Sequence, residues 1–263
     1  MTGVGIGWRP EIAAFVGALP GPAFTEVVAE SLHHIDPALL PDVPVVPHGV
    51  KLSLGGAGEV DPARVRLLAE AAELVRAPLV SEHVAFVRAG GLEAGHLLPV
   101  PRSRESLDAL TRNIRLTLAE LDVPLAVEPI AALFDWPDDE FTEGEFLTEL
   151  LDRTGARLLL DVANVYANAR NRGRDPVAVL ESFPLDRVAY VHVAGGAEHD
   201  GLYHDTHAHA LPQEVLALVA ETARRVPDHL GYLLERDGDY PPAADLVREL
   251  DAVADAASLP RIT

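Results

Sequence analysis

The chain has 263 residues, and its 41 acidic and 21 basic side chains give a formal net charge of −20. A chain this acidic repels phosphate backbones and shows no basic run, so we expect no nucleic-acid partner. The absence of cysteine excludes disulfides, thiolate metal sites and cysteine nucleophiles, which leaves nitrogen and oxygen as metal ligands. No signal peptide or bilayer-length apolar stretch is evident, so the sequence predicts a cytoplasmic protein without membrane contact.

Short apolar runs alternate with amphipathic segments along the chain. The runs are mostly continuous, as is typical of parallel strands buried on both faces. They cover residues 4–8, 24–30, 43–52, 78–86, 124–130, 157–162, 188–193 and 231–235. Helices are predicted over 61–76, 103–121, 142–153, 176–182, 212–226 and 242–257, with a less regular proline-rich crossover at 31–42. Asp61-Pro62 and Asp175-Pro176 have the pattern of helix N-caps, and Thr142 to Glu145 that of a capping box.

Eight strands alternating with helices predict an α/β fold, a (β/α)8 TIM barrel formed by residues 1–263 as one domain. An open doubly wound sheet is the competing architecture. Its nucleotide-binding form needs a G-x-G-x-x-G turn after the first strand. Here Gly3, Gly5 and Gly7 alternate inside the strand itself, which argues against that form.

Residues that can bind metals stand at the ends of the predicted strands, where barrel enzymes build their active sites. The set comprises His48, His83, Glu128, Asp161, His192 and Glu235, with Asn164, Asp205 and His207 in following segments. Singly, each histidine could be a hydrogen-bonded core residue and each carboxylate a loop cap. Together, so many buried charged groups would cost several kcal/mol each unless cations compensate them. The pattern therefore favours a multinuclear site for iron, zinc or manganese.

Other polar residues have weaker claims to this site. Glu30 and Glu82 either support the ligands or are structural, and Asp237 is expected to orient Arg236 or a ligand. His96, His199 and His204 lie in candidate loops above the site, whereas His33, His34, His209 and His229 are expected at the surface. Glu128 and Glu235 could form a glycosidase carboxylate pair, but this leaves the histidines and aspartates unexplained.

Several motifs together resemble a known family. They are HGVKLSLG (48–55), SEHVAF (81–86), LLPVPRSRESL (97–107), LLLDVANVY (158–166), NRGRDP (171–176), VHVAGG (191–196), DTH (205–207) and LLERD (233–237). In this order, and over about residues 3 to 250, they are similar to the multinuclear non-haem iron-dependent oxidative enzymes. That family includes the enzyme of methanobactin biosynthesis. Many of its members have a histidine where this chain has Gly196.

The resemblance implies a xylose-isomerase-like barrel with two or three iron ions (Fe2+/Fe3+) and O2 as co-substrate. The implied activity is oxidation or rearrangement of a side chain in a ribosomally synthesised precursor peptide, with a separate peptide-recognition protein as a further partner. The implied ligands form three groups: His48, His83 and Glu128; Asp161, His192 and Glu235; Asn164, Asp205 and His207. Apart from the resemblance, we expect Glu30, Glu82, Arg236 and Asp237 to support the ligands or to bind the substrate.

Three other functions remain open at this stage. The ligand order is also similar to that of the trinuclear zinc barrel that cleaves DNA at abasic sites, although Asn164 stands where that family has a histidine. A sugar isomerase of the same architecture would need fewer metals. A non-enzymatic metal-binding protein would not need an open coordination position.

Overall fold

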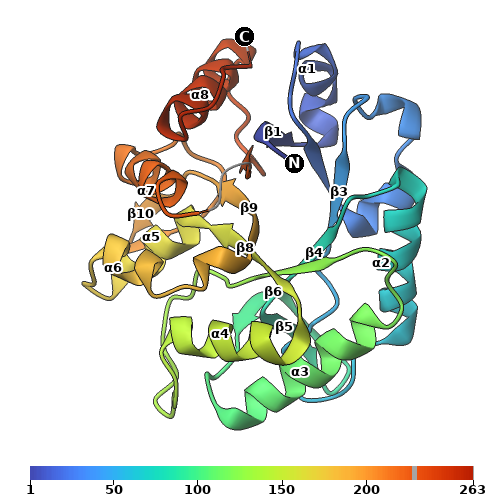
Figure 1. The fold of residues 1–263 in the computed structure, drawn as a ribbon, viewed down its shortest axis with the longest axis vertical. Helices are drawn as coiled ribbons and strands as arrows, with labels where there is room; N and C mark the ends of the chain where they lie inside the picture. Colours follow the sequence, from blue (N-terminus) through green and yellow to red (C-terminus); the bar gives the residue numbers. More distant parts are fainter. Residues whose placement is uncertain (227–229, 263) are drawn as a thin grey trace.

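The computed structural model describes residues 1–226 and 230–262, and within them eight parallel strands close into a barrel (Figure 1). The strands are β1 (Gly3–Gly7), β2 (Thr25–Val28), β3 (Val45–His48), β4 (Val80–His83), β7 (Leu125–Glu128), β8 (Arg157–Asp161), β9 (Val188–Val193) and β12 (Gly231–Leu234). Their order around the barrel is β1-β12-β9-β8-β7-β4-β3-β2. Because β1 pairs with both β2 and β12, the barrel prediction is confirmed and the open sheet is excluded.

Helices surround this barrel. Those that match predicted segments are α2 (Pro62–Val75), α3 (Arg104–Leu118), α4 (Glu143–Thr154), α6 (Pro176–Glu181), α7 (Gln213–Ala223) and α8 (Ala243–Ala256). Asp61, Asp175 and the Thr142–Glu145 box cap their helices as predicted. Short 3-10 turns cover Pro10–Ile12, Ala29–His34, Pro37–Leu39 and Leu185–Arg187. Among the described residues, no helix is both long and apolar enough to cross a membrane.

Two helices were not predicted, α1 (Ala13–Ala18) and α5 (Val162–Asn171). Helix α5 begins directly where β8 ends, so no loop separates it from the strand. Asp161 closes the strand and caps the helix, because its Oδ1 accepts from the backbone amides of Ala163 at 2.6 Å and Asn164 at 3.0 Å. The start of α5 therefore lies within the apolar run that was predicted as a strand, next to the candidate ligand Asp161.

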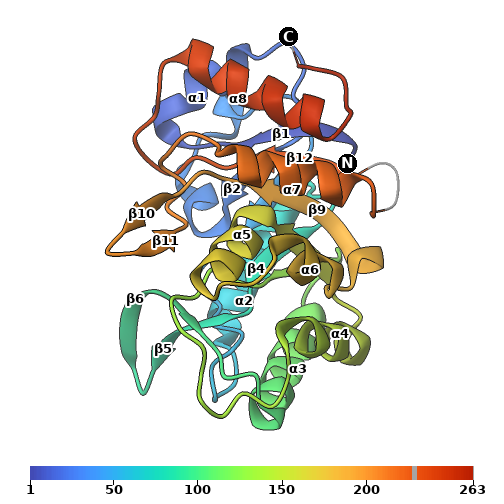
Figure 2. The same cartoon turned by 90° about the vertical axis from the view of Figure 1, so that its left-hand side faces the viewer.

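Two antiparallel hairpins were also not predicted. One joins β5 (Ala85–Ala89) to β6 (Leu92–Pro99), and the other joins β10 (Ala197–His199) to β11 (Leu202–His204). They follow β4 and β9, and both project from the same side of the barrel (Figure 2). The predicted strand 78–86 is in fact split, since β4 ends at His83 and β5 starts at Ala85. These hairpins therefore extend the carboxyl-end face on which the candidate ligands lie.

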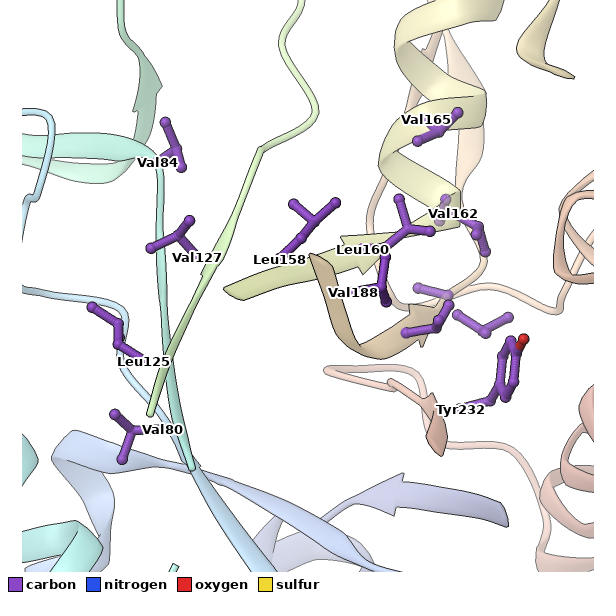
Figure 3. Packing of buried hydrophobic residues seen from close by; sticks show 14 of the residues in the cluster. Val80, Val84, Leu125, Val127, Leu158, Leu160, Val162, Val165, Val188 and Tyr232 are labelled. Carbon is purple, nitrogen blue, oxygen red and sulfur yellow. The ribbon is translucent and has the colours of Figure 1, made fainter. Parts of the chain in front are cut away.

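Side chains alternate along each strand between the barrel interior and the surrounding helices. Leu125, Val127, Leu158 and Leu160 are among the buried residues between β7, β8 and α5 (Figure 3). The alternate positions form an apolar floor inside the barrel. This floor consists of six fully buried residues: Phe24, Val46, Ala126, Leu159, Tyr190 and Leu233. Gly5 leaves space for the Phe24 ring of this floor, because a β-carbon at position 5 would lie 2.8 Å from that ring.

Candidate metal centre

A polar layer lies two residues further along each strand that contributes to the apolar floor. It consists of Glu26, His48, Glu128, Asp161, His192 and Glu235, all buried. Since side chains alternate with a period of two, each of these residues faces the interior above a floor residue. The predicted convergence of strand-end ligands is thus a direct result of strand geometry.

The first group of potential ligands comes from β3, β4 and β7. The Nε2 atoms of His48 and His83 lie 3.7 Å and 3.5 Å from Glu128 Oε2. The other ring nitrogens are held from outside the group: His48 Nδ1 contacts Ser81 Oγ at 2.8 Å, and His83 Nδ1 contacts the Gly49 carbonyl at 3.1 Å. Both rings therefore present one nitrogen to the same carboxylate oxygen, as two imidazole ligands of one ion would.

The second group is centred on His192. Its Nε2 contacts Glu26 Oε2 at 2.9 Å, while its Nδ1 lies 2.9 Å from Glu235 Oε2 and 3.8 Å from Glu128 Oε1. Glu128 can thus face two neighbouring groups. Glu128, Asp161 and His192 together offer three ligand atoms that lie close enough for one cation.

The third group includes the loop after β11. His207 Nε2 lies 2.6 Å from Asp205 Oδ2 and 3.9 Å from Asp161 Oδ2, and its Nδ1 lies 3.4 Å from Glu235 Oε2. Asp161, His207 and Glu235 can share an ion. Asp161 therefore belongs to both the second and the third group, as Glu128 belongs to the first and second.

Several buried atoms in this layer lack hydrogen-bond partners. They are Glu128 Oε2, Asp161 Oδ2, His192 Nδ1, Asp205 Oδ1 and Glu235 Oε2. The other oxygens of three carboxylates are held by protein donors: Asn164 on Glu128, backbone amides on Asp161 and Arg9 on Glu235. Each carboxylate is thus fixed by one oxygen. The other oxygen of Glu128 and of Asp161 has no hydrogen-bond partner, and that of Glu235 forms an ion pair with His192. Leaving such atoms unpaired is costly, so the donor set fits bound cations.

Protonation inside this layer is strongly perturbed. Burial lowers the pKa of His48 to about 4 and raises the pKa of Glu128 to about 8. Burial also opposes protonation of His83, but the Glu128 and Glu82 carboxylates raise its pKa to about 9. Burial and Asp205 raise the pKa of Asp161 to about 6. Protons therefore compensate the carboxylates in the metal-free layer, and bound cations would displace them.

Asn164, a predicted ligand, contacts protein groups through both atoms of its side-chain amide. Its amide oxygen accepts from the Ala131 backbone amide at 2.9 Å, which also fixes the orientation of the group. Its Nδ2 donates to Glu128 Oε1 and to the Pro129 carbonyl, both at 3.2 Å. Asn164 therefore holds Glu128 in place. Among histidine and carboxylate side chains, Asp161, His207 and Glu235 form a third group. The role of Asn164 as a ligand beside Asp205 and His207 stays a prediction.

The predicted supporting residues have different surroundings. Glu82 accepts from the Leu52 and His83 backbone amides at 2.8 Å and 2.7 Å. Asp237 contacts His207 Nδ1 at 3.2 Å and Arg9 Nε at 2.8 Å, so it orients a candidate ligand. Arg236 is directed away from the layer and pairs with Glu249 of α8 through two contacts of 2.8 Å.

Glu30 was expected at the end of the second strand, but β2 ends at Val28. Its Oε1 accepts from the Val50 backbone amide at 3.1 Å, outside the polar layer. The residue of this strand that enters the layer is Glu26, which sequence reasoning missed. Its position two residues after Phe24 was the available signal, because His48 and Glu128 follow Val46 and Ala126 in the same way.

The remaining histidines that the structure describes lie outside the polar layer. His33, His34 and His209 are exposed as expected, and His229 lies outside the described residues. His199 and His204 are on the β10–β11 hairpin, with ring centroids 5.8 Å apart. A side chain at position 196 has no room, since a β-carbon on Gly196 would lie 2.2 Å from the His204 carbonyl oxygen.

A cavity of about 830 Å3 opens above the layer. His48, His83, His207 and Glu235 are at its base, and Val28, Val50, Val87 and Leu97 contribute apolar wall. Its rim includes Lys51, Arg64, Glu93 and His96. Since Val87, Glu93, His96 and Leu97 belong to β5 and β6, the first hairpin forms one wall. The cavity therefore gives a ligand direct access to the histidine rings.

The model of the family described as RiPP precursor modification enzyme MbnB/TglH/ChrH matches residues 3–258. The chain belongs to this family. The resemblance of its motifs is therefore confirmed, and membership in a family of modification enzymes supports an enzymatic function. Relatives include a UPF0276 protein of Streptomyces avermitilis, 54% identical over 95% of this chain, and one of Caulobacter vibrioides, 37% identical over 95%. This chain spans 54% of the Streptomyces protein and 92% of the Caulobacter protein.

Solved structures support the xylose-isomerase-like fold. A xylose isomerase domain protein from Planctomyces limnophilus has a TM-score of 0.64 at 14% identity, covering 97% of this chain and 96% of its own. D-Psicose 3-epimerase from Clostridium cellulolyticum has a TM-score of 0.63 at 10% identity, covering 98% of both. Endonuclease IV from Thermus thermophilus has a TM-score of 0.58 at 19% identity, covering 97% and 98%. At these identities the similarity extends to the fold alone.

Proposed function

We propose that this protein is a multinuclear iron-dependent oxygenase or oxidase that modifies a side chain of a ribosomally synthesised peptide. The observation that carries the proposal is the set of buried ligand atoms without hydrogen-bond partners on Glu128, Asp161 and Asp205, next to the ion pair of His192 and Glu235. Family membership supports the peptide substrate class. The absence of cysteine and the mixed histidine and carboxylate donors suit iron.

Three ions would be held by groups that share their carboxylates. The first would use His48, His83 and Glu128; the second Glu128, Asp161 and His192; and the third Asp161, His207 and Glu235. Asp205, whose Oδ2 lies 2.6 Å from His207 Nε2, would complete the third. When bound, iron would supply the electrons and the open coordination position needed to activate O2 against a peptide side chain.

The surrounding residues would keep the ligands in one geometry. Asn164 fixes Glu128, Arg9 fixes Glu235, and the start of α5 fixes Asp161. Each contact acts on one carboxylate oxygen, so the carboxylate is oriented before an ion arrives. The apolar floor below excludes water from that side of the layer.

The cavity would receive the peptide. Its base exposes the histidine rings, and its apolar walls between the barrel and the first hairpin are typical of a ligand site of this size. A separate recognition protein that presents the precursor is part of this proposal. Its contribution is tested by comparing turnover of the isolated chain with turnover in the presence of candidate partners.

Anaerobic purification followed by elemental analysis tests the metal centre. We expect at least two metal ions per chain, with ferrous iron restoring O2-dependent modification of a candidate precursor peptide in metal-free protein. Mass spectrometry of the peptide would detect the product. A stoichiometry below one ion per chain that does not rise with added ferrous iron would contradict the proposal.

An assay with abasic duplex DNA separates this function from hydrolysis. We expect no meaningful affinity for duplex DNA at physiological salt, because the net charge of −20 opposes binding to phosphates. Electrophoretic mobility shifts and strand-cleavage gels with added zinc provide the measurement. Tight binding with zinc-stimulated cleavage would favour the hydrolytic alternative.

A further inference from the structure

A series of buried hydrogen bonds connects the first two groups of candidate ligands. Tyr190 lies in the apolar floor and is the member of that floor with a hydroxyl group. Its oxygen lies 2.7 Å from Ser81 Oγ and 2.5 Å from Glu26 Oε2. Ser81 Oγ in turn lies 2.8 Å from His48 Nδ1. Tyr190 therefore connects His48 on β3 with Glu26 on β2 by a route through β4 and β9.

The donor and acceptor groups allow these hydrogen bonds to run in only one direction, from His48 to Glu26. The Tyr190 hydroxyl donates its one proton to Glu26 Oε2. The Tyr190 oxygen then accepts from the Ser81 hydroxyl, whose proton is thereby used. Ser81 Oγ can consequently only accept from His48, which places the ring proton on Nδ1. This tautomer leaves Nε2, on the side of Glu128, without a proton.

We propose that Tyr190 is a positioning residue that, with Ser81 and Glu26, selects the tautomer in which His48 can bind an ion. The inference rests on the proposed metal centre, where a bare Nε2 beside Glu128 is required of a ligand. His83 does not depend on Tyr190, whereas His192 shares the Glu26 Oε2 atom with it. Gly49 and Glu82 hold His83 Nδ1, and Glu26 contacts His192 Nε2 directly.

Two substitutions interrupt this series of hydrogen bonds at different points. Tyr190→Phe removes the acceptor of the Ser81 proton, so Ser81 becomes free to donate to His48 Nδ1 and the proton moves to Nε2. Ser81→Ala removes the acceptor of the Nδ1 proton, with the same result. Tyr232→Phe is the matched control, because Tyr232 is also buried on a barrel strand but packs in the outer apolar cluster (Figure 3).

Nitrogen-15 NMR of the histidine rings in metal-free protein near pH 7.5 measures the tautomer directly. We expect the Nδ1–H form of His48 in the wild type and in Tyr232→Phe. We expect a mixture or the Nε2–H form in Tyr190→Phe and Ser81→Ala, with unchanged His83 signals. Thermal unfolding identifies any variant that does not fold. An unchanged His48 tautomer in both folded variants overturns the inference.

Cobalt(II) titration with a competing chelator measures the consequence for binding. We expect the affinity of one ion position to fall about 10–100-fold in Tyr190→Phe, as is typical for the loss of a group that orients a ligand. Ser81→Ala should show a similar loss, and the double variant should lose no more than Ser81→Ala alone. Wild-type affinity in both variants overturns the inference. A wild-type chain that binds no ions contradicts the proposed function instead, while the tautomer measurement still decides the role of Tyr190.

Discussion

The candidate metal centre has a strand half and a loop half, and they are built differently. His48, Glu128 and His192 are buried on barrel strands directly above floor residues, and His83 is buried two residues after Ser81. His207 belongs to the segment after β11, its side chain is 18% exposed, and its backbone adopts a left-handed φ of 53°. Asp237 and Asp205 hold its ring from either side. The strand half is fixed by the fold, whereas the loop half is fixed by its own contacts.

This difference between the two halves indicates which candidate ligands can change position. A strand residue cannot move without its floor partner two positions earlier, and a close-packed core resists such a shift. The loop half rests on ion pairs at the base of the cavity. We therefore expect the strand half to determine metal retention and the loop half to tune it.

The largest expected effect is that of Glu128→Gln, which removes the carboxylate shared by two groups of the strand half. Glutamine is nearly isosteric and can still accept from Asn164 Nδ2. Because burial already keeps the pKa of Glu128 at about 8, a neutral side chain costs little in the metal-free fold. We expect a near-native circular dichroism spectrum, with iron affinity reduced on the order of 100-fold or more and turnover lost.

Glu143→Gln is the control for this substitution, because Glu143 lies at the start of α4 and outside the polar layer. It should retain metal and turnover. Full metal occupancy together with full activity in Glu128→Gln would remove Glu128 from the centre, and the distinction between the halves would fail.

The stability of the metal-free protein should depend on pH in a defined direction. His83 has a folded pKa raised to about 9, so its contribution is fully present below an unfolded value of about 6.5 and is lost as the pH rises through 9. The pKa of Glu128, raised to about 8, acts in the same direction. We expect the free energy of unfolding to fall by about 3 kcal/mol between pH 6.5 and 9 because of His83 alone.

Urea unfolding at several pH values measures this change, and His83→Gln should reduce the slope. Bound metal should reverse the trend, because it replaces the protons that the layer otherwise holds. Metal-free stability that rises with pH over this range would show that the strand half is not compensated by protons.

The smallest effect is expected in the loop half. His207→Ala should weaken one ion position about tenfold and leave the other two occupied, because those depend on strand residues. His209→Ala is the control, since His209 lies in the same segment, is exposed and contacts Thr206. Elemental analysis after dialysis measures the difference. Loss of all ions in His207→Ala would show that the two halves bind metal as one unit.

The strand half could be predicted from the sequence for a physical reason. Parallel strands are continuous apolar runs, so a histidine or carboxylate at the end of one is conspicuous, and barrel closure brings such ends together. Glu26 was missed because its strand was expected to extend to Glu30, which moved attention to the wrong residue. Asn164 was predicted as a ligand from the family resemblance, whereas its contacts with Ala131 and Glu128 depend on the start of α5, which the sequence pattern did not reveal.

The hairpins and the loop half were harder to predict. The second hairpin depends on a close backbone approach at Gly196 and on contacts of Asn171 with the Tyr203 backbone, neither of which has a local sequence pattern. The direction of the Tyr190 hydrogen bonds follows only once four strands are placed around one centre. Local pattern thus indicates which residues reach the site, while tertiary contacts decide how each one is held.

The apolar floor has a consequence for the order of events during turnover. Phe24, Leu159 and Leu233 close the barrel beneath the ligands, so ions, oxygen and substrate must all come from the cavity side. In the proposed function, a peptide in that cavity would cover the histidine rings and block the path by which an ion enters or leaves. Metal loading would then precede peptide binding, and a bound peptide would slow the removal of iron by a chelator.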